Sequence, residues 1–458
     1  MRIAVCVRQG LDGEINPFDA CAYEEALKIE GAEITLLSMG PESASELLLK
    51  LTRLGAKRAV LLSDRAFAGA DTLATAYTLS LALKKISPDF VFCGRQTLIG
   101  DTAQTGAMLS VMAGYSIITN VLNIDKVDGS SIRCTTREEG KMQAEAPALI
   151  TVERINSLRL PRLRSKLGEL EVWSASDIGA DISRCGLKGS PTRVLKTFEN
   201  QSGKRKCKFI SKNELENAIS CGLKKKDEAA ESLFDSTAEK FDFVCAVGDS
   251  AESFAENITE KIIKIPLSNA VEIERQIRNI NPPVVLWGSD TKSKRLAAMV
   301  AAKMNLGLCA DCTAIKCEGG ETAMYRPALS GSIIAKIKSL TRPAMATVRS
   351  KTAIGSRIIV AAGDGVKGKI DEVKRFASDI GAEFCSSRKL VDNGCSKYEE
   401  QVGLTGKTVS PDVYIAIGIS GAVQHIVGME RSGTVIAINP DKNAPIFEYS
   451  DYGILEEF

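Results

Sequence analysis

The stretch Val413-Tyr414-Ile415-Ala416-Ile417-Gly418-Ile419-Ser420-Gly421-Ala422-Val423-Gln424-His425 decides the fold class of the C-terminal part of the chain, and it contains the single histidine among 458 residues. Its first five residues are uninterrupted apolar side chains, which is typical of a strand buried on both faces of a parallel sheet. A glycine-containing turn and a helix start follow, where backbone N–H groups carry partial positive charge and a ligand can approach closely. The stretch therefore predicts a strand, a turn and a helix that bind an anionic ligand, with His425 contacting either that ligand or the local backbone.

The same alternation of apolar strands and helical patterns recurs along the chain. We expect strands at 3–7, 32–37, 59–62, 90–93, 358–361 and 435–438, with helices at 20–29, 44–54, 73–86 and 370–380. This rhythm predicts an α/β protein made of doubly wound parallel sheets. Ligands on such sheets bind beyond the carboxyl ends of the strands, so polar segments at those ends are the candidate sites.

An internal repeat links two regions of the chain. Residues 86–94 (Ile-Ser-Pro-Asp-Phe-Val-Phe-Cys-Gly) match residues 280–288 (Ile-Asn-Pro-Pro-Val-Val-Leu-Trp-Gly), and residues 147–152 match residues 343–348 at nearly the same separation. The shared separation favours two related α/β units, which could pair about a pseudo-twofold axis. The alternative is two generic strands that each follow a proline turn.

The composition argues against several classes of protein. Lys and Arg number 59 against 57 Asp and Glu, so the net charge of +2 gives no reason to expect a nucleic acid or a membrane surface as partner. Neither a signal-peptide pattern nor an apolar run of roughly 18 residues is present. The 13 scattered cysteines favour reduced thiols, and Cys309-Ala310-Asp311-Cys312 lacks the second ligand pair of a zinc site. We expect a cytoplasmic protein without membrane insertion or bound metal.

Changes in composition predict the domain boundaries. Residues 199–240 are polar, with basic clusters at 204–206 and 224–226, and are expected to be a charged linker or arm. The other regions, 1–198, 241–350 and 351–458, are expected to be three α/β domains.

Several motifs of the C-terminal region resemble a known family. They are Gly403-Leu404-Thr405-Gly406-Lys407-Thr408-Val409-Ser410-Pro411, then 414–425, Ala437-Ile438-Asn439, Ala444-Pro445-Ile446-Phe447 and Asp451-Tyr452-Gly453. Their order and spacing resemble the FAD domain of the electron transfer flavoprotein alpha subunit.

The N-terminal region resembles the beta subunit of the same family. The motifs are Ile15-Asn16-Pro17-Phe18, Glu24-Glu25-Ala26-Leu27, Ser38-Met39-Gly40-Pro41, the run 63–72 and Gly100-Asp101-Thr102-Ala103-Gln104-Thr105-Gly106. The resemblance implies a fusion with the beta part first. Residues 1–198 and 241–350 would be related adenine-nucleotide-hydrolase-like domains, the second one shortened, and 351–458 a flavodoxin- or Rossmann-like FAD domain.

The resemblance also implies the FAD contacts in 351–458. They would be Ser387, Arg388, Gln401, Val402, Gly403, Leu404, Thr405, Ser420, Gly421, Ala422, Val423, Gln424, His425 and Asn439. His425 would face the pyrimidine end of the flavin and, helped by the charge of Arg388, stabilise negative charge on the reduced ring. Two residues depart from the family pattern: Asp364 stands where an arginine is usual, and Leu404 where a glutamine is usual.

A second nucleotide pocket is implied in the beta-like domain. Its residues would be Cys6, Asn16, Met39, Gly94, Arg95, Gln96, Gly100, Asp101, Thr102, Ala103, Gln104 and Thr105. In carriers of the family this pocket holds AMP, and in the electron-bifurcating branch it holds a second FAD that takes hydride from NADH. The 94–96, 100–104 and 66–72 segments favour the bifurcating branch, whereas the short loop after the first strand favours AMP, so both alternatives stay open.

The implied function is an electron carrier rather than an enzyme with its own substrate. FAD would accept electrons from a flavin dehydrogenase of the acyl-CoA dehydrogenase type and pass them to a quinone- or dehydrogenase-linked acceptor. The segment 158–163, Leu-Arg-Leu-Pro-Arg-Leu, lies where the family docks its dehydrogenase. The alternatives are a bifurcating, NADH-oxidising flavoprotein and a nucleotide-binding protein without redox activity.

Overall fold

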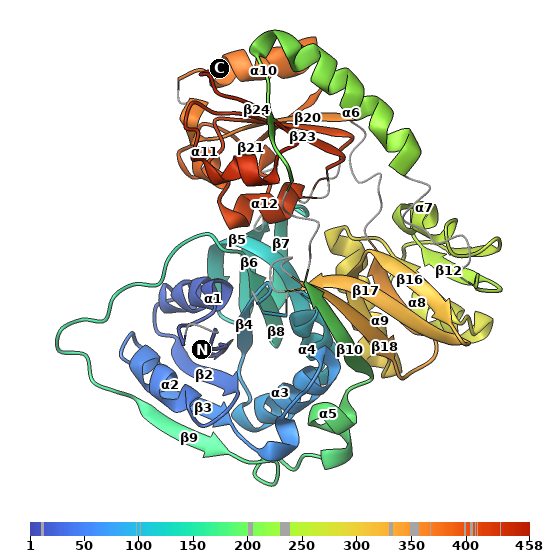
Figure 1. Ribbon diagram of the computed structural model, residues 1–458. Coiled ribbons are helices and arrows are strands. Elements are labelled where there is room, and N and C mark those ends of the chain that lie inside the picture. The colour runs from blue at the N-terminus through green and yellow to red at the C-terminus, as the bar shows by residue number, and fades with distance from the viewer. Residues whose placement is uncertain are drawn as a thin grey trace. The chain divides into compact units, whose positions relative to one another are not determined.

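The computed structural model describes residues 1–10, 13–97, 99–100, 102–199, 205–229, 239–328, 333–348, 357–366, 368–397, 400–403, 406–407, 409, 411–430 and 432–458. The chain forms two compact units (Figure 1). Unit 1 contains Met1–Thr197, Glu239–Leu329 and Ala335–Arg349, and unit 2 contains Phe198–Ala238, Ser330–Ile334 and Ser350–Phe458.

The first half of unit 1 is built on a nine-stranded sheet in the order β7-β6-β5-β8-β4-β1-β2-β3-β9. The strands are β1 (Arg2–Cys6), β2 (Glu33–Met39), β3 (Arg58–Leu62), β4 (Phe90–Gly94), β5 (Ser116–Asp128), β6 (Ser131–Thr136), β7 (Lys141–Glu145), β8 (Ala148–Val152) and β9 (Glu169–Trp173). Strands β1, β2, β3, β4 and β8 are parallel, whereas β6 runs antiparallel to β5 and β7. The chain moves from β1 to β2 on one side and returns to β4 on the other. The carboxyl ends of β1 and β4 therefore form a topological switch point, the usual place for a ligand.

Helices cover both faces of this sheet. Helices α1 (Pro17–Leu27) and α2 (Ala44–Thr52) contribute Tyr23 and Leu48 to the core on one face. Helices α3 (Thr72–Ile86) and α4 (Thr105–Ala113) contribute Leu79 and Met108 to the core on the other face. Helices on both faces confirm the expected doubly wound fold. The apolar strands require this cover on each side of the sheet.

The second half of unit 1 repeats the first. Its five-stranded sheet has the order β13-β12-β14-β19-β15, which matches β2-β1-β4-β8-β5 strand by strand. These strands are β12 (Val244–Val247), β13 (Ile262–Ile265), β14 (Val284–Trp287), β15 (Leu308–Cys312) and β19 (Ala344–Val348), with helices α7 (Glu252–Ala255), α8 (Ala270–Ile280) and α9 (Thr291–Met304).

Local detail is repeated as well. The N–H of Asn120 donates to Thr151 Oγ1, and the N–H of Asp311 donates to Thr347 Oγ1, and both donors have positive φ. The relationship predicted from the sequence is therefore confirmed.

The two halves of unit 1 share one core. Helices α4 and α9, which are equivalent in the repeat, pack against each other, and one buried cluster includes Met108 of α4 and Val300 of α9. Polar contacts join the halves too: Arg295 forms an ion pair with Glu139 at 2.5 Å. A four-stranded sheet, β10-β18-β17-β16, also combines both halves, with β10 (Thr192–Glu199), β16 (Ala314–Glu318), β17 (Glu321–Ala328) and β18 (Ile333–Ser339). A short helix α5 (Gly186–Gly189) precedes β10.

Unit 2 is a six-stranded sheet in the order β11-β24-β23-β22-β20-β21. The strands are β11 (Lys208–Phe209), β20 (Ile358–Ala362), β21 (Glu383–Ser386), β22 (Val413–Ile417), β23 (Thr434–Ile438) and β24 (Tyr452–Ile454), and all their pairings are parallel. Helices α6 (Leu215–Ala229) and α10 (Ile370–Asp379) cover one face, and α12 (Val423–Met429) covers the other. Strand β20 has β21 on one side and β22 on the other, so its carboxyl end is the switch point of this sheet.

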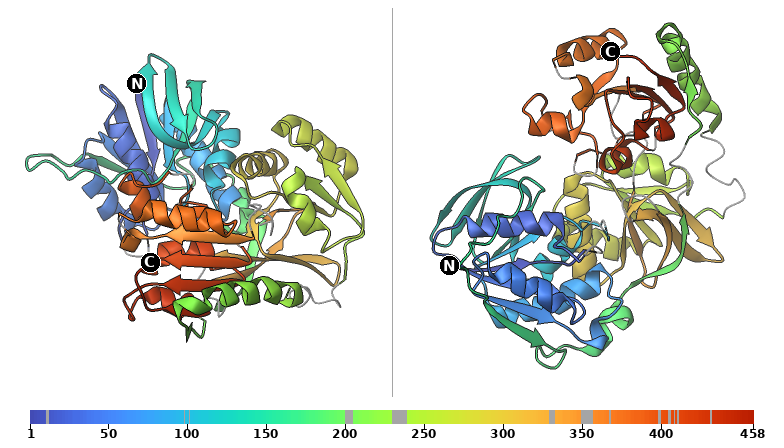
Figure 2. Two further views of the ribbon diagram at one scale, coloured as in Figure 1. Left: turned by 90° about the horizontal axis from the view of Figure 1, so that it is seen from above. Right: turned by 60° about the vertical axis from the view of Figure 1, so that its left-hand side comes forward.

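The segment expected to be a charged linker, 199–240, is partly a component of unit 2. Its described residues 205–229 supply the edge strand β11 and the helix α6, which packs along the sheet (Figure 2). Leu215, Ala218 and Ile219 of α6 are buried, whereas the rest of the helix is rich in lysine. Because the segment is so polar, its narrow apolar stripe does not indicate a helix in the sequence. Packing against the sheet stabilises the helix. Among the helices of the described ranges, none has the length and apolar character required to cross a membrane.

Candidate functional site

The predicted FAD residues of unit 2 converge on the carboxyl ends of its strands. Ser387 and Arg388 follow β21, the 401–403 segment bridges to Ser386, the 420–425 loop follows β22, and Asn439 follows β23. Ser420, Ala422, Val423 and Gln424 are exposed, whereas Gln401, Val402, Gly421 and His425 are buried. Leu404 and Thr405 lie outside the described residues.

Glycines allow the loops around β20 to approach one another closely. A Cβ on Gly363, directly after β20, would lie 2.2 Å from the carbonyl oxygen of Gly418. Gly421 has φ +92°, and a Cβ there would lie 2.2 Å from the nitrogen of Ile446. Gly403 has φ +140°, and its Cβ would lie 2.7 Å from the carbonyl oxygen of Gln424. The backbone of three loops is thus brought together at the switch point, where N–H groups can reach a ligand.

His425 is held in the first turn of α12. Its Nε2 lies 2.9 Å from the hydroxyl of Tyr414, a buried residue of β22. Its Nδ1 is buried and has no well-aligned hydrogen-bond partner among the described residues. Burial lowers the pKa of His425 to about 4, although a hydrogen-bonding contact with the backbone of Val402 opposes the shift. The ring is therefore neutral at pH 7. His425 would contact a bound flavin as an uncharged hydrogen-bonding group and not as a cation.

Two further hydroxyl groups lack partners at the same edge of the sheet. Ser386 Oγ and Ser387 Oγ are buried and make no hydrogen bond within the described ranges. Ser387 precedes α11 (Arg388–Asp392), and Arg388 Nε lies 3.1 Å from Asp392 Oδ2. Buried polar groups without partners are unfavourable, so these hydroxyls and His425 Nδ1 are suited to a polar ligand.

Asp364, the departure from the family pattern, stands at the switch point itself. Its carboxylate lies 2.7 Å from Lys389 Nζ and 3.4 Å from Asn393 Nδ2, so neighbouring residues largely neutralise it. Asn439 is also engaged locally, because its Nδ2 donates to the carbonyl of Ile419 and its Oδ1 accepts from the N–H of Asp441. Asn439 therefore fixes the loop after β22.

The predicted residues of the beta-like pocket gather at the β1/β4 switch point of unit 1. Cys6, Met39 and Gly94 end β1, β2 and β4, Asn16 precedes α1, and Thr105 begins α4. Asn16 Nδ2 donates to the carbonyl of Gln96 at 2.9 Å, whereas Asn16 Oδ1 and Gln104 Nε2 are buried with no hydrogen-bond partner in the described part. Arg95 Nε lies 3.3 Å from the buried Glu153, and Ala103 has positive φ. Gly100 and Thr102 belong to the same loop, and Asp101 lies outside the described residues.

Two residues of this pocket were missed by sequence reasoning. Asp19 is buried, and its carboxylate accepts from the N–H of Arg8 and the N–H of Gly94, which joins the loops after β1 and β4. Burial raises the pKa of Asp19 to about 7, although hydrogen bonds from Asn16, Arg8 and Gly94 oppose the shift. Arg326 reaches the pocket loop from β17 and donates to the carbonyl of Gly100 at 3.1 Å. An acid in the first turn of a helix looks like an ordinary capping residue, and no local signal indicates Arg326.

An extended arm, residues 158–168, leaves unit 1 between β8 and β9. Three of its four leucines are strongly exposed, with Leu160 at 88%, Leu163 at 101% and Leu167 at 60%, whereas Leu158 packs against the core. Arg162, Arg164 and Lys166 between them are exposed as well. The arm therefore presents apolar side chains within a basic surface.

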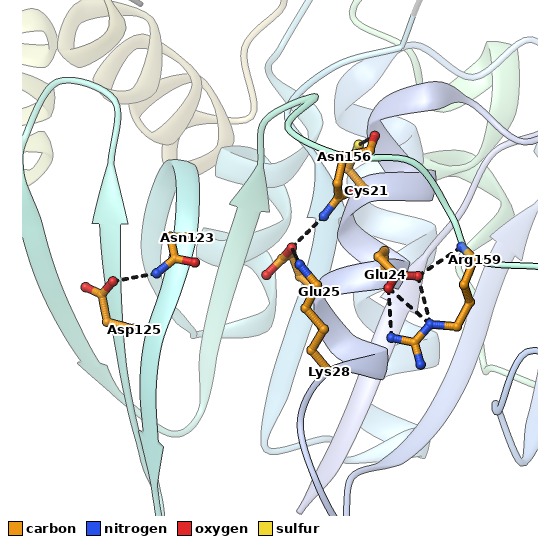
Figure 3. A network of polar contacts seen from close by, with 8 residues as sticks. All are labelled: Cys21, Glu24, Glu25, Lys28, Asn123, Asp125, Asn156 and Arg159. Carbon is orange, nitrogen blue, oxygen red and sulfur yellow. Dashed lines mark hydrogen bonds and ion pairs between the residues drawn. The ribbon is translucent and has the colours of Figure 1, made fainter. Parts of the chain in front are cut away.

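Polar contacts to α1 hold the start of this arm (Figure 3). Arg159 donates three hydrogen bonds through Nε and Nη2 to the carboxylate of Glu24, at 2.7 to 3.0 Å. Asn156 Nδ2 donates to Glu25 Oε1 at 2.6 Å. At the other end, the N–H of Gly168 donates to Thr52 Oγ1. The arm is thus anchored at both ends while Leu160, Leu163 and Leu167 stay exposed.

Taken together, these features define a protein with two doubly wound sheets, each with buried polar atoms at its switch point. Comparison with known families then identifies the class: the electron transfer flavoprotein domain matches residues 3–178 and 266–375, and the electron transfer flavoprotein FAD-binding domain matches residues 354–430. The chain belongs to the electron transfer flavoprotein family.

Relatives over the N-terminal half support this assignment. Protein FixA of Azorhizobium caulinodans is 44% identical over 227 residues, which cover 45% of this chain and 81% of that protein. The electron transfer flavoprotein subunit beta of Clostridium acetobutylicum is 41% identical over 202 residues, covering 42% and 78%. The corresponding subunit of Megasphaera elsdenii is 40% identical over 211 residues, covering 42% and 78%. A beta-type half is thus followed by an alpha-type FAD-binding domain in one chain.

The residues present in unit 2 fit FAD. Backbone N–H groups at glycine turns suit the phosphates, and the orphaned Ser386, Ser387 and His425 atoms offer polar contacts. When bound, FAD supplies one- and two-electron chemistry, and the protein supplies binding and orientation.

Proposed function

We propose that this protein is a single-chain electron carrier. FAD in unit 2 receives electrons from a flavin dehydrogenase of the acyl-CoA dehydrogenase type and delivers them to a quinone- or dehydrogenase-linked acceptor. The observation that carries this proposal is the convergence of His425 Nδ1, Ser386 Oγ and Ser387 Oγ, all buried and without partners in the described part, at the switch point of the FAD-binding domain.

The visible spectrum of the purified protein tests this proposal. We expect flavin absorbance and at least one FAD per chain after the nucleotides are released and quantified. A colourless protein that retains only AMP would exclude electron transfer and favour a nucleotide-binding protein without redox activity.

We propose that the 158–168 arm docks the dehydrogenase. Exposed leucines flanked by Arg162, Arg164 and Lys166 suit an apolar pocket with an acidic rim. Leu163→Asp should slow electron transfer from the dehydrogenase at least about tenfold while FAD content stays unchanged. Ile182→Asp, at another exposed apolar position, is the matched control. Equal rates for both variants would exclude the arm as the docking surface.

A second candidate function is an electron-bifurcating, NADH-oxidising flavoprotein with a second FAD in the beta-like pocket. It is supported by Asn16 Oδ1 and Gln104 Nε2, polar atoms at the β1/β4 switch point that lack partners within the described ranges. AMP would use the same atoms. Two FAD per chain with reduction by NADH favours bifurcation, whereas one FAD with one AMP excludes it. Gln104→Met should lower the occupancy of the nucleotide in unit 1 and leave FAD in unit 2 unchanged. The nucleotide whose amount falls is therefore the one that the unit 1 pocket holds.

We propose the cytoplasm as the location. All 13 cysteines are free thiols, and Cys6, Cys245 and Cys385 have pKa values raised to about 12 by burial. Such thiols resist oxidation, as expected in a reducing compartment.

A further inference from the structure

We propose that Tyr414 is a positioning residue that fixes the tautomer of His425, so that the hydrogen of the imidazole stands on Nδ1 and serves as a donor to the flavin. This inference rests on the proposed function of unit 2. It assigns a role to a strand residue that otherwise looks like ordinary core.

The contact between the two rings is direct and shielded from water. Tyr414 is fully buried in β22, and His425, at the start of α12, is 6% exposed. The hydroxyl of Tyr414 lies 2.9 Å from Nε2, and the two ring centroids are 6.2 Å apart with planes inclined at 57°. Tyr414 of this strand therefore contacts Nε2 of the imidazole, and Nδ1 remains available for another partner.

The direction of this hydrogen bond follows from the chemistry of the pair. Burial raises the pKa of Tyr414 well above its usual value, so the phenol keeps its hydrogen. Among the described residues, Nε2 of His425 is the acceptor within reach of this hydroxyl. Tyr414 therefore donates and Nε2 accepts.

The second nitrogen must then carry the ring hydrogen. Burial keeps His425 neutral, so the imidazole has one N–H, and Nε2 is already an acceptor. The hydrogen stands on Nδ1, which is buried and has no well-aligned hydrogen-bond partner in the described part of the chain beside the contact that the ring makes with the Val402 backbone. An unpaired buried donor is unfavourable, and an acceptor on a bound ligand relieves that cost. In the opposite tautomer, Nδ1 would present a lone pair and could not donate a hydrogen bond to a bound ligand.

The single histidine makes this tautomer directly measurable. Protein labelled with ¹⁵N-histidine gives the ring signals of one imidazole without further assignment. In the wild type, with and without FAD, we expect Nδ1 to have the shift of a protonated nitrogen and Nε2 that of an unprotonated one. Tyr414→Phe removes only the hydroxyl, and we expect the spectrum to shift toward the Nε2–H form.

The bound flavin provides an independent second measurement. Loss of a fixed donor in Tyr414→Phe should shift the equilibrium between oxidised and reduced FAD about fivefold toward the oxidised form. Tyr452→Phe, on strand β24 of the same sheet, is the matched control and should change neither the ring shifts nor the potential.

Each outcome decides the proposal. A wild-type spectrum with Nε2 protonated would overturn it even if the Tyr414→Phe variant failed to fold, and so would identical ring shifts in the wild type and the variant. A protein that binds no flavin would refute the proposed function instead, because the tautomer can be read from the ligand-free protein. An unchanged flavin equilibrium alongside an altered tautomer would also overturn the role of Tyr414 toward the flavin.

Discussion

At the scale of single residues, both sites are organised by buried polar side chains that join neighbouring loops. Asp19 accepts from the N–H groups of Arg8 and Gly94, which follow β1 and end β4. Asn439 binds the carbonyl of Ile419, and Tyr414 binds His425. These contacts arrange the loops without a ligand, so little reorganisation remains when a nucleotide binds.

The buried carboxyl of Asp19 predicts a pH dependence of stability. Its pKa rises from the ordinary value of 3.8 to about 7 in the folded protein, because burial disfavours the charged form. The folded state then binds this proton more tightly than the unfolded state, so stability falls as the pH rises from about 4 to about 7. Asp19→Asn cannot titrate, and the free energy of unfolding of the variant relative to wild type should improve from pH 5 to pH 8.

Denaturant unfolding at both pH values measures this difference. Asp128→Asn, at an exposed site of β5, is the control and should show no such trend above pH 5. A constant difference between wild type and Asp19→Asn would mean that Asp19 is already ionised at pH 5.

Gly421 should be required for FAD binding because of both its conformation and its surroundings. At φ +92°, Gly421→Ala introduces strain of roughly 1 kcal/mol, and its Cβ would lie 2.2 Å from the Ile446 nitrogen. Gly368 has a similar φ of +83° but open space around it, so Gly368→Ala carries the strain without the clash. We expect FAD per chain, measured by absorbance, to fall in Gly421→Ala and to persist in Gly368→Ala. Equal retention of FAD would show that the loop can rearrange.

At the scale of elements, the sequence predicts the strands well and the peripheral helix poorly. Continuous apolar runs such as 413–417 indicate buried strands because successive residues of a strand face opposite sides of a sheet that is covered on both faces. The sequence of helix α6 is rich in lysine and has few apolar residues, so its pattern resembles a linker as long as the sheet that it covers is not known. The glycine turns of the FAD site were predictable from composition, whereas Tyr414 and Asp19 required coordinates because their partners lie on other elements.

Arg205 should hold the β11 and α6 segment on the sheet of unit 2. Its guanidinium donates to the carbonyls of Glu430, Ser432 and Gly433 and to the carboxylate of Asp451. Because charged hydrogen bonds contribute about 1.5–3 kcal/mol each, Arg205→Ala should release this segment locally. Limited proteolysis should then cleave within 205–229 faster than in wild type. Lys206→Ala, at the exposed neighbour, is the control, and equal cleavage of both variants would contradict the anchoring role.

At the scale of the whole molecule, unit 1 contains two copies of one α/β fold, and we expect the two copies to have different roles. The first copy has a long loop between β4 and α4, where we propose the second nucleotide pocket, whereas α9 begins within four residues of β14. Side chains crowd the matching glycine in both copies, because a Cβ on Gly94 would lie 2.5 Å from Asp19 Oδ1 and one on Gly288 would lie 1.9 Å from Ser250 Oγ, so the copies differ in this loop. The second copy therefore supports the first through the contact of α4 with α9.

This shared core predicts that the two halves of unit 1 unfold together. Val300 of α9 is fully buried in the cluster that also contains Met108 of α4, and Val300→Asp would bury a charge without a partner. Hydrogen exchange should then increase in peptides of β1 and β4 as well as in peptides of α8 and β14. Val271→Asp makes the same substitution at a 63% exposed position of α8 and should leave exchange unchanged. Loss of protection confined to residues 239–349 would show instead that the halves fold independently, as separate beta and alpha subunits would require before they meet.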